Sequence, residues 1–419
     1  MNIETTLRNA PLPRLVDLLK EQADVRYDVA VPAGRLHYSG GNLHVVNGAV
    51  RFTDDADVLS AVECDAVLAP TDVFEEGISH RLGIPRAYLR TLRGEQVSVS
   101  VPGEWDEEGG PLSMSLLDAN VNGWFEHDPA RMFLVRAFRT DDPDAVGIAR
   151  AFLSNKFAIG MDNYDVLLAA LAGAKEAGLD PQSLDISADL SERQMRVKIH
   201  APEITALAPI LLGNYRSPFA RSGHGQTGLR DEGLGTVRDG GGSDLPVVEA
   251  GVVIGNSETG GGAWTAAPNL RVRICSNGMT HKADALREVH VGGRLEEGVV
   301  TWSTDTQRKN LDLIVARTRD AVATFLDADY VQHVIDEIEA VSATPVDDVL
   351  GTIERVAKVH VFSEAEQASI LDCFIKSGDT TAGGVMQAVT AAAQMLEDPD
   401  RAGDFEDMAL DVLATAAKS

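Results

Sequence analysis

The stretch QMRVKIHAP, residues 194–202, alternates polar and apolar side chains along its length. Its apolar side chains occupy every second position: Met195, Val197 and Ile199. Arg196 and Lys198 fall between them and share the opposite face of an extended chain, because side chains alternate along a strand. This period of two predicts a β-strand with one apolar and one basic face.

Further strands and helices are predicted on both sides of this stretch. Further strands are predicted at 96–103, 132–139, 247–256 and 270–275. From Asp305 to Val341 the apolar residues recur at intervals of three and four, which predicts one or two long helices. Shorter helices are predicted at 347–358, 363–376, 384–396 and 405–415. The sequence therefore predicts an α+β protein with a mixed, β-rich core and a helical C-terminal region.

Three regions are expected. Residues 1–94 form a mixed segment of helices and short strands, in which Asn47-Gly48 reads as a hairpin turn. Residues 95–302 form the β-containing core. Within that core, residues 216–245 are rich in Gly and Arg and are expected to be a long loop. Residues 303–419 form an acidic helical region.

The charge is unevenly spread over the 419 residues. The whole chain has a formal net charge of −27, but residues 191–319 hold 16 basic and 14 acidic residues. An anionic partner would therefore be expected to bind the middle of the chain. No run approaches the roughly 18 uninterrupted apolar residues of a membrane span. With no signal-like start, the sequence predicts a soluble protein of the cytoplasm.

The cysteines and histidines offer an alternative site. Three widely spaced cysteines without a CxxC pair fit a reducing compartment and argue against a structural zinc site. Cys275 lies at a strand end with His281 and His290 near in sequence, so a Cys275 nucleophile with His290 as its base is conceivable. The spacing of His281, Glu288 and His290 matches no standard metal motif. No cofactor and no metal are predicted.

Basic and aromatic residues in the middle of the chain suggest single-stranded nucleic acid as a partner. Binding of this kind combines a basic groove with aromatic rings on which bases stack. The predicted phosphate contacts are Arg196, Lys198, Arg221, Arg271 and Arg273, and the predicted stacking residue is Trp264. Pairing of each Arg with an acidic neighbour is the alternative for every one of these positions.

Several short motifs resemble an uncharacterised family of phage and plasmid proteins, one of the domain-of-unknown-function families. They are RAFLSNKFAIGMDN (150–163), IGNSETGGGAW (254–264), ICSNG (274–278) and HVGG (290–293). The residues at family-like positions are Arg150, Ser154, Asp162, Asn163, Asn256, Ser257, Glu258, Gly260, Cys275, Asn277, Gly278 and His290. The resemblance implies a mobile element and the cytoplasm of a bacterial host, but it implies no reaction.

The leading functional hypothesis is a phage- or plasmid-encoded protein of DNA metabolism. It would bind single-stranded nucleic acid without catalysis, in strand annealing or recombination, and as a homo-oligomer without a membrane partner. Two alternatives stay open. One is a structural or assembly protein that forms a homo-oligomer through the helical region. The other is a small-molecule or Cys/His-dependent enzyme.

Overall fold

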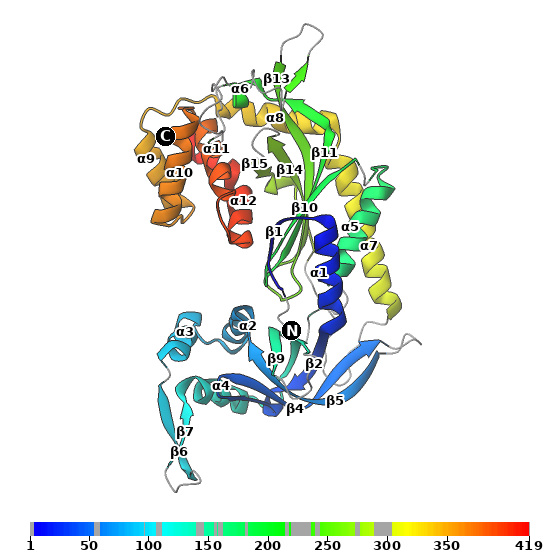
Figure 1. The fold of residues 1–419 in the computed structure, drawn as a ribbon, viewed down its shortest axis with the longest axis vertical. Coiled ribbons are helices and arrows are strands. Elements are labelled where there is room, and N and C mark those ends of the chain that lie inside the picture. The colour runs from blue at the N-terminus through cyan, green and yellow to red at the C-terminus, as the bar shows by residue number, and fades with distance from the viewer. Residues whose placement is uncertain are drawn as a thin grey trace.

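The computed structural model has the α+β fold that the sequence predicts, with two large sheets, a separate two-stranded hairpin and a helical C-terminal region (Figure 1). It describes residues 4–53, 59–95, 97–105, 111–139, 146–154, 157, 162–180, 183–213, 218, 236–238, 244–272, 277–288 and 304–418.

The first sheet, here called sheet A, is antiparallel. Its hydrogen-bonded order is β1 (Leu7–Pro11), β10 (Asp185–Leu190), β11 (Met195–Leu207), β13 (Asp244–Asn256), β14 (Trp264–Val272) and β15 (Asn277–Thr280). Two short strands extend it: β12 (Thr236–Arg238) pairs with β13, and β16 (Leu286–Glu288) pairs with β14. The predicted strand at 194–202 is confirmed as the first part of β11, next to the centre of the sheet.

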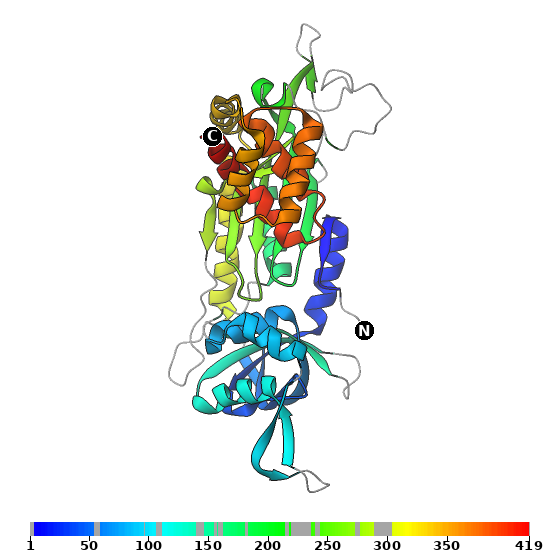
Figure 2. The same ribbon diagram turned by 90° about the vertical axis from the view of Figure 1, so that its left-hand side faces the viewer.

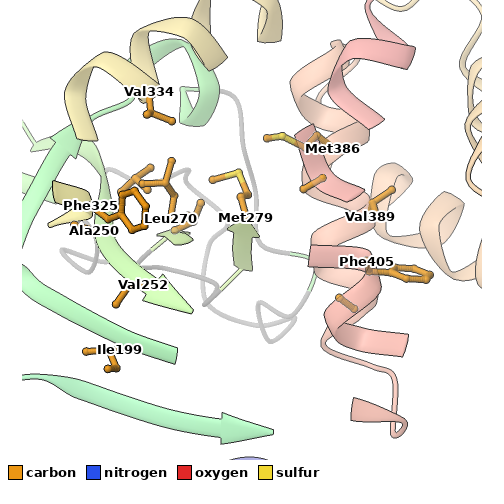
Figure 3. Packing of buried hydrophobic residues seen from close by; sticks show 14 of the residues in the cluster. Ile199, Ala250, Val252, Leu270, Met279, Phe325, Val334, Met386, Val389 and Phe405 are labelled. Atoms are coloured by element: carbon orange, nitrogen blue, oxygen red, sulfur yellow. The ribbon is translucent and has the colours of Figure 1, made fainter. Parts of the chain in front are cut away.

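One face of sheet A is apolar and carries four helices. They are α1 (Leu12–Val25), α5 (Asn163–Glu176), α7 (Thr304–Phe325) and α8 (Ala328–Ser342). Ile199, Val252 and Leu270 lie on this face, with Phe325 and Val334 of the helices above them (Figure 3). Burial of such aliphatic and aromatic side chains contributes about 1.5–3 kcal/mol each, so this layer forms the main core.

The opposite face of sheet A is covered by α11 (Ala382–Ala393) and α12 (Pro399–Ala416), which pack against β15. Helix α9 (Val349–Val359) packs on α12, and α10 (Glu364–Ser377) packs on α11. The short helix α6 (Pro209–Leu212) lies between β11 and β12 in the chain. Turned by 90°, the molecule shows these C-terminal helices standing in front of the sheet (Figure 2). The predicted capping box of Ser363 and Glu366 is confirmed at the start of α10.

The second sheet, here called sheet B, closes on itself. Its order is β2 (Arg26–Pro32), β8 (Met132–Phe138), β9 (Gly147–Ser154), β5 (Leu59–Pro70), β4 (Asn42–Thr53) and β3 (Leu36–Ser39), and β2 also pairs with β4. Helices α2 (Asp72–Leu82), α3 (Arg86–Glu95) and α4 (Leu116–His127) pack around it. The hairpin of β6 (Ser98–Trp105) and β7 (Pro111–Ser115) projects from the end of this half (Figure 1).

Two expectations from the sequence need correction. The boundary near residue 95 is wrong, because β8 and β9 complete the sheet that β2 begins. The Asn47-Gly48 hairpin is also wrong: Asn47 has a φ of +49° inside β4, where the pairing with β5 shifts at a bulge. Of the loop expected at 216–245, Thr236–Arg238 is the strand β12 and most of the rest lies outside the described residues.

Gly173 sets the close contact between α5 and α7. A Cβ at this position would lie 2.7 Å from the Val315 carbonyl oxygen and 2.8 Å from the Arg319 backbone nitrogen. Gly173→Ala should therefore push the helices apart and destabilise the fold by about 1–3 kcal/mol. The measurement is urea unfolding.

Gly123→Ala is the matched control for this prediction. A Cβ at Gly123 of α4 would meet no atom within 4 Å, so alanine should stabilise that helix by about 0.5–1 kcal/mol. If the free energy of unfolding changed with the same sign in both variants, the packing of α5 on α7 would be contradicted.

Candidate functional site

The face of sheet A beneath α11 and α12 is polar. The buried polar side chains on this face include Asp189, Arg196, Lys198, His200, Glu249, Asn269 and Thr280. Buried polar groups cost free energy unless they are paired or hydrogen-bonded. Such a layer inside an otherwise apolar core is the most informative feature of the structure.

Helix α12 supplies the carboxylates that pair with β11. The Arg196 guanidinium donates two hydrogen bonds to Asp407, of 2.9 Å and 2.6 Å. Lys198 Nζ lies 2.7 Å from Glu406 Oε1 and 3.1 Å from Asp189 Oδ2. Burial opposes ionisation of Asp407, but the Arg196 charge outweighs it and holds the pKa of this carboxyl below its usual value.

A hydrogen-bonded chain crosses four strands of the same face. His200 Nε2 lies 2.8 Å from Asn269 Oδ1, and Asn269 Nδ2 donates to Thr280 Oγ1 at 3.2 Å. Thr280 also helps to lower the pKa of the Asp407 carboxyl. Gly251 lies between His200 and Asn269 in register, and a Cβ there would be 2.4 Å from the imidazole. The glycine therefore gives the ring room to cross β13.

A cavity of about 350 Å³ opens beside this chain. Its walls include Arg8, Lys198, His200, Asn269, Arg271 and Glu406. Two buried atoms of residues that line this cavity, His200 Nδ1 and Glu406 Oε2, have no hydrogen-bond partner among the described residues. Burial and the nearby Arg271 lower the pKa of His200 to about 4, so the imidazole is neutral at pH 7.

A second group of charges joins sheet B to sheet A. Arg136 of β8 is fully buried and donates two hydrogen bonds of 2.8 Å to Asp28 of β2. Its Nη1 atom lies 2.9 Å from both Asp162 Oδ1 and the carbonyl oxygen of Glu258. Arg26 also pairs with Asp162. These contacts hold the start of α5 and the turn after β13 against sheet B.

Glu258 is the other carboxylate of this junction. Its Oε1 atom accepts from Arg150 Nη1 at 2.6 Å, and its Oε2 atom accepts from the backbone N–H of Asn163 at 3.2 Å. Asn256 Nδ2 donates to the Asn163 side chain at 2.9 Å. These contacts use both oxygens of Glu258, so the junction acts as a structural link between the two halves.

The structure thus brings together five of the residues at family-like positions: Arg150, Asp162, Asn163, Asn256 and Glu258. Ser257 lies beside them and donates to the carbonyl oxygen of Arg193, while Gly260 has a φ of +82° in the same turn. Ser154 ends β9. Asn277 and Gly278 lie apart from this group on β15, and Gly278 lines the cavity.

The predicted nucleic-acid contacts take other roles. Trp264 is fully buried, so its assignment as a base-stacking residue is corrected. Arg196 and Lys198 do share a face, but α12 covers that face and its carboxylates pair with both cations. Arg271 pairs with Glu249 and Asp185. For Arg196, Lys198 and Arg271, the alternative prediction of pairing with acidic residues is therefore confirmed. Arg221 and Arg273 lie outside the described residues.

The Cys/His alternative cannot be placed, since Cys275 and His290 both lie outside the described residues. Of the other histidines, His281 lies 3.3 Å from Asp284. Within the ranges that the structure describes, no group of three or more His, Cys, Asp or Glu residues is arranged to hold a metal ion.

Sequence reasoning missed the most informative residues of the cavity. His200, Asn269 and Glu406 carry no motif, and Glu406 is separated from Lys198 by 208 residues. One usable signal was present: His200 continues the polar face that Arg196 and Lys198 begin, at the next position of the same period.

Comparison with protein-family models, with curated proteins and with solved structures finds no match to this chain. The resemblance to phage and plasmid proteins therefore stays a prediction. Within the described residues, none of the helices combines the length and the apolar character that crossing a bilayer requires.

Replacing Arg136 tests the junction. Arg136→Met would leave the carboxylates of Asp28 and Asp162 buried without their main partner, which should cost about 3–5 kcal/mol of unfolding free energy. Urea unfolding measures this cost. A variant that no longer unfolds cooperatively would show an even larger loss of stability and would also support the prediction. Lys309→Met, which breaks an exposed pair with Asp305, should cost less than about 0.5 kcal/mol. Equal losses of unfolding free energy in the two variants would contradict the role of Arg136 in the junction.

Asp165 gives the junction a pH dependence. Burial and the adjacent Asp162 raise the pKa of Asp165 to about 6. The neutral form is therefore favoured in the fold, and its contribution to stability is full below pH 3.8 and is lost as the pH rises through 6. Asp165→Asn should raise the melting temperature at pH 8, with no difference from the wild type near pH 4. A lower melting temperature of the variant at pH 8 would contradict this assignment.

Proposed function

We propose that this protein binds a small polar molecule in the cavity between sheet A and α12. The observation that carries the proposal is the pair of buried atoms without partners, His200 Nδ1 and Glu406 Oε2. Buried polar atoms are satisfied in the great majority of cases, and exceptions at a cavity point to a missing partner. A volume of about 350 Å³ is within the range of small-molecule sites.

Binding is favoured over catalysis by the state of His200. A general base works best when its pKa lies near the working pH. With a pKa of about 4, His200 is about three units too weak a base for neutral pH, although its lone pair still accepts a hydrogen bond. The small-molecule alternative from the sequence is therefore kept as a binding function, without a reaction.

Single-stranded nucleic acid is not the partner that this site favours. The described cations assigned to phosphate contacts, Arg196, Lys198 and Arg271, are engaged by carboxylates of α12 and of the sheet. A DNA-binding function and a homo-oligomer stay predictions from the sequence, and DNA binding would need another surface.

Native mass spectrometry of the full-length protein tests the proposal. After gentle purification and then denaturation, the wild type should release a small molecule. Ser187→Phe should abolish this release, because Ser187 lines the cavity and the larger side chain fills it.

Ser113→Phe is the matched control, since Ser113 is exposed on β7, far from the cavity in the fold. It should release the same molecule as the wild type. Both variants should keep cooperative thermal unfolding. Equal release from the Ser187→Phe and Ser113→Phe variants, or no released molecule from the wild type, would contradict the proposal.

A further inference from the structure

The class of ligand follows from the direction of the hydrogen bonds at the cavity. Asn269 Nδ2 is a donor and donates to Thr280 Oγ1, so the amide oxygen is at the other end of the group, toward His200. This fixes Asn269 Oδ1 as the acceptor toward His200, so His200 Nε2 carries the proton. Since the imidazole is neutral, Nδ1 holds a bare lone pair.

Glu406 also lines the cavity and holds a second buried acceptor. Its Oε1 atom is occupied by Lys198 Nζ at 2.7 Å, whereas its Oε2 atom is buried without a partner among the described residues. A carboxylate oxygen cannot donate a hydrogen bond. Both His200 Nδ1 and Glu406 Oε2 are acceptors on residues that line the cavity, and neither has a donor among the described residues.

The charges around the cavity also disfavour an anion. The lining cations are Arg8, Lys198 and Arg271. The carboxylates bound to them are Asp185, Asp189, Glu249 and Glu406. Three cations thus face four carboxylates, and an anionic ligand would have to displace carboxylates that are already paired. The basic residues of the lining, considered without their acidic partners, would suggest an anionic ligand.

We propose that the ligand is a neutral or cationic small molecule with at least two N–H or O–H donors, of the amine or amide class, which donates to His200 Nδ1 and Glu406 Oε2. The inference rests on the proposed binding function and narrows it. Donors of this kind would satisfy both buried acceptors and would offset the excess carboxylate.

Isothermal titration calorimetry of the full-length protein at pH 7.5 tests the class. The donor probes are 1,3-diaminopropane and adenine, and the anionic probes are succinate and inorganic phosphate. At least one donor probe should bind saturably at one site per chain, and neither anion should. If an anion binds and no donor does, the class is wrong and the binding function stands. If no probe binds, both are wrong.

Two variants locate the binding. Glu406→Gln and His200→Phe each remove one acceptor, and each should weaken the donor probe about tenfold or more, as expected for a lost buried hydrogen bond. Having two variants keeps the test usable if one of them fails to fold. Lys309→Met, on the exposed surface of α7, should bind as the wild type does. Unchanged affinity in both acceptor variants would place the probe elsewhere and overturn the assignment.

Discussion

The ion pairs between β11 and α12 are the interaction on which the site depends. Sheet A has one face that is apolar and packs on helices, and another that is polar and charged. A buried charge is tolerated only with a close partner of opposite sign. Asp407 and Glu406 provide these partners for Arg196 and Lys198 at 2.6–2.9 Å. Helix α12 therefore both covers the polar face and completes the cavity wall.

Much of the fold follows from local patterns in the sequence. The alternation at 194–202 predicts β11 and places Arg196 and Lys198 on one face, and the three-and-four spacing after Asp305 predicts α7 and α8. Local patterns failed where a neighbouring strand decides the geometry. Asn47-Gly48 has the composition of a hairpin turn, but pairing with β5 on either side makes it a bulge within one strand.

The site itself could be predicted only in part. The sequence shows that the basic residues share a face, and it leaves open what lies opposite. Asp407 is 211 residues from Arg196 in the chain, so no local pattern pairs them. The family-like residues were found as a set, yet their convergence on Arg136 depends on two sheets meeting. Arg136 itself lies in a plain apolar run and gives no signal of its role.

The protonation of His200 tests the account most directly. A long-range ¹H–¹⁵N correlation spectrum of the full-length protein, recorded from pH 5 to pH 8, distinguishes the two imidazole nitrogens. The account predicts a proton on Nε2, a bare Nδ1 and no titration in this range, because the pKa lies at about 4. A proton on Nδ1, or a titration midpoint near 6.5, would contradict the direction of the hydrogen-bond chain and with it the ligand site.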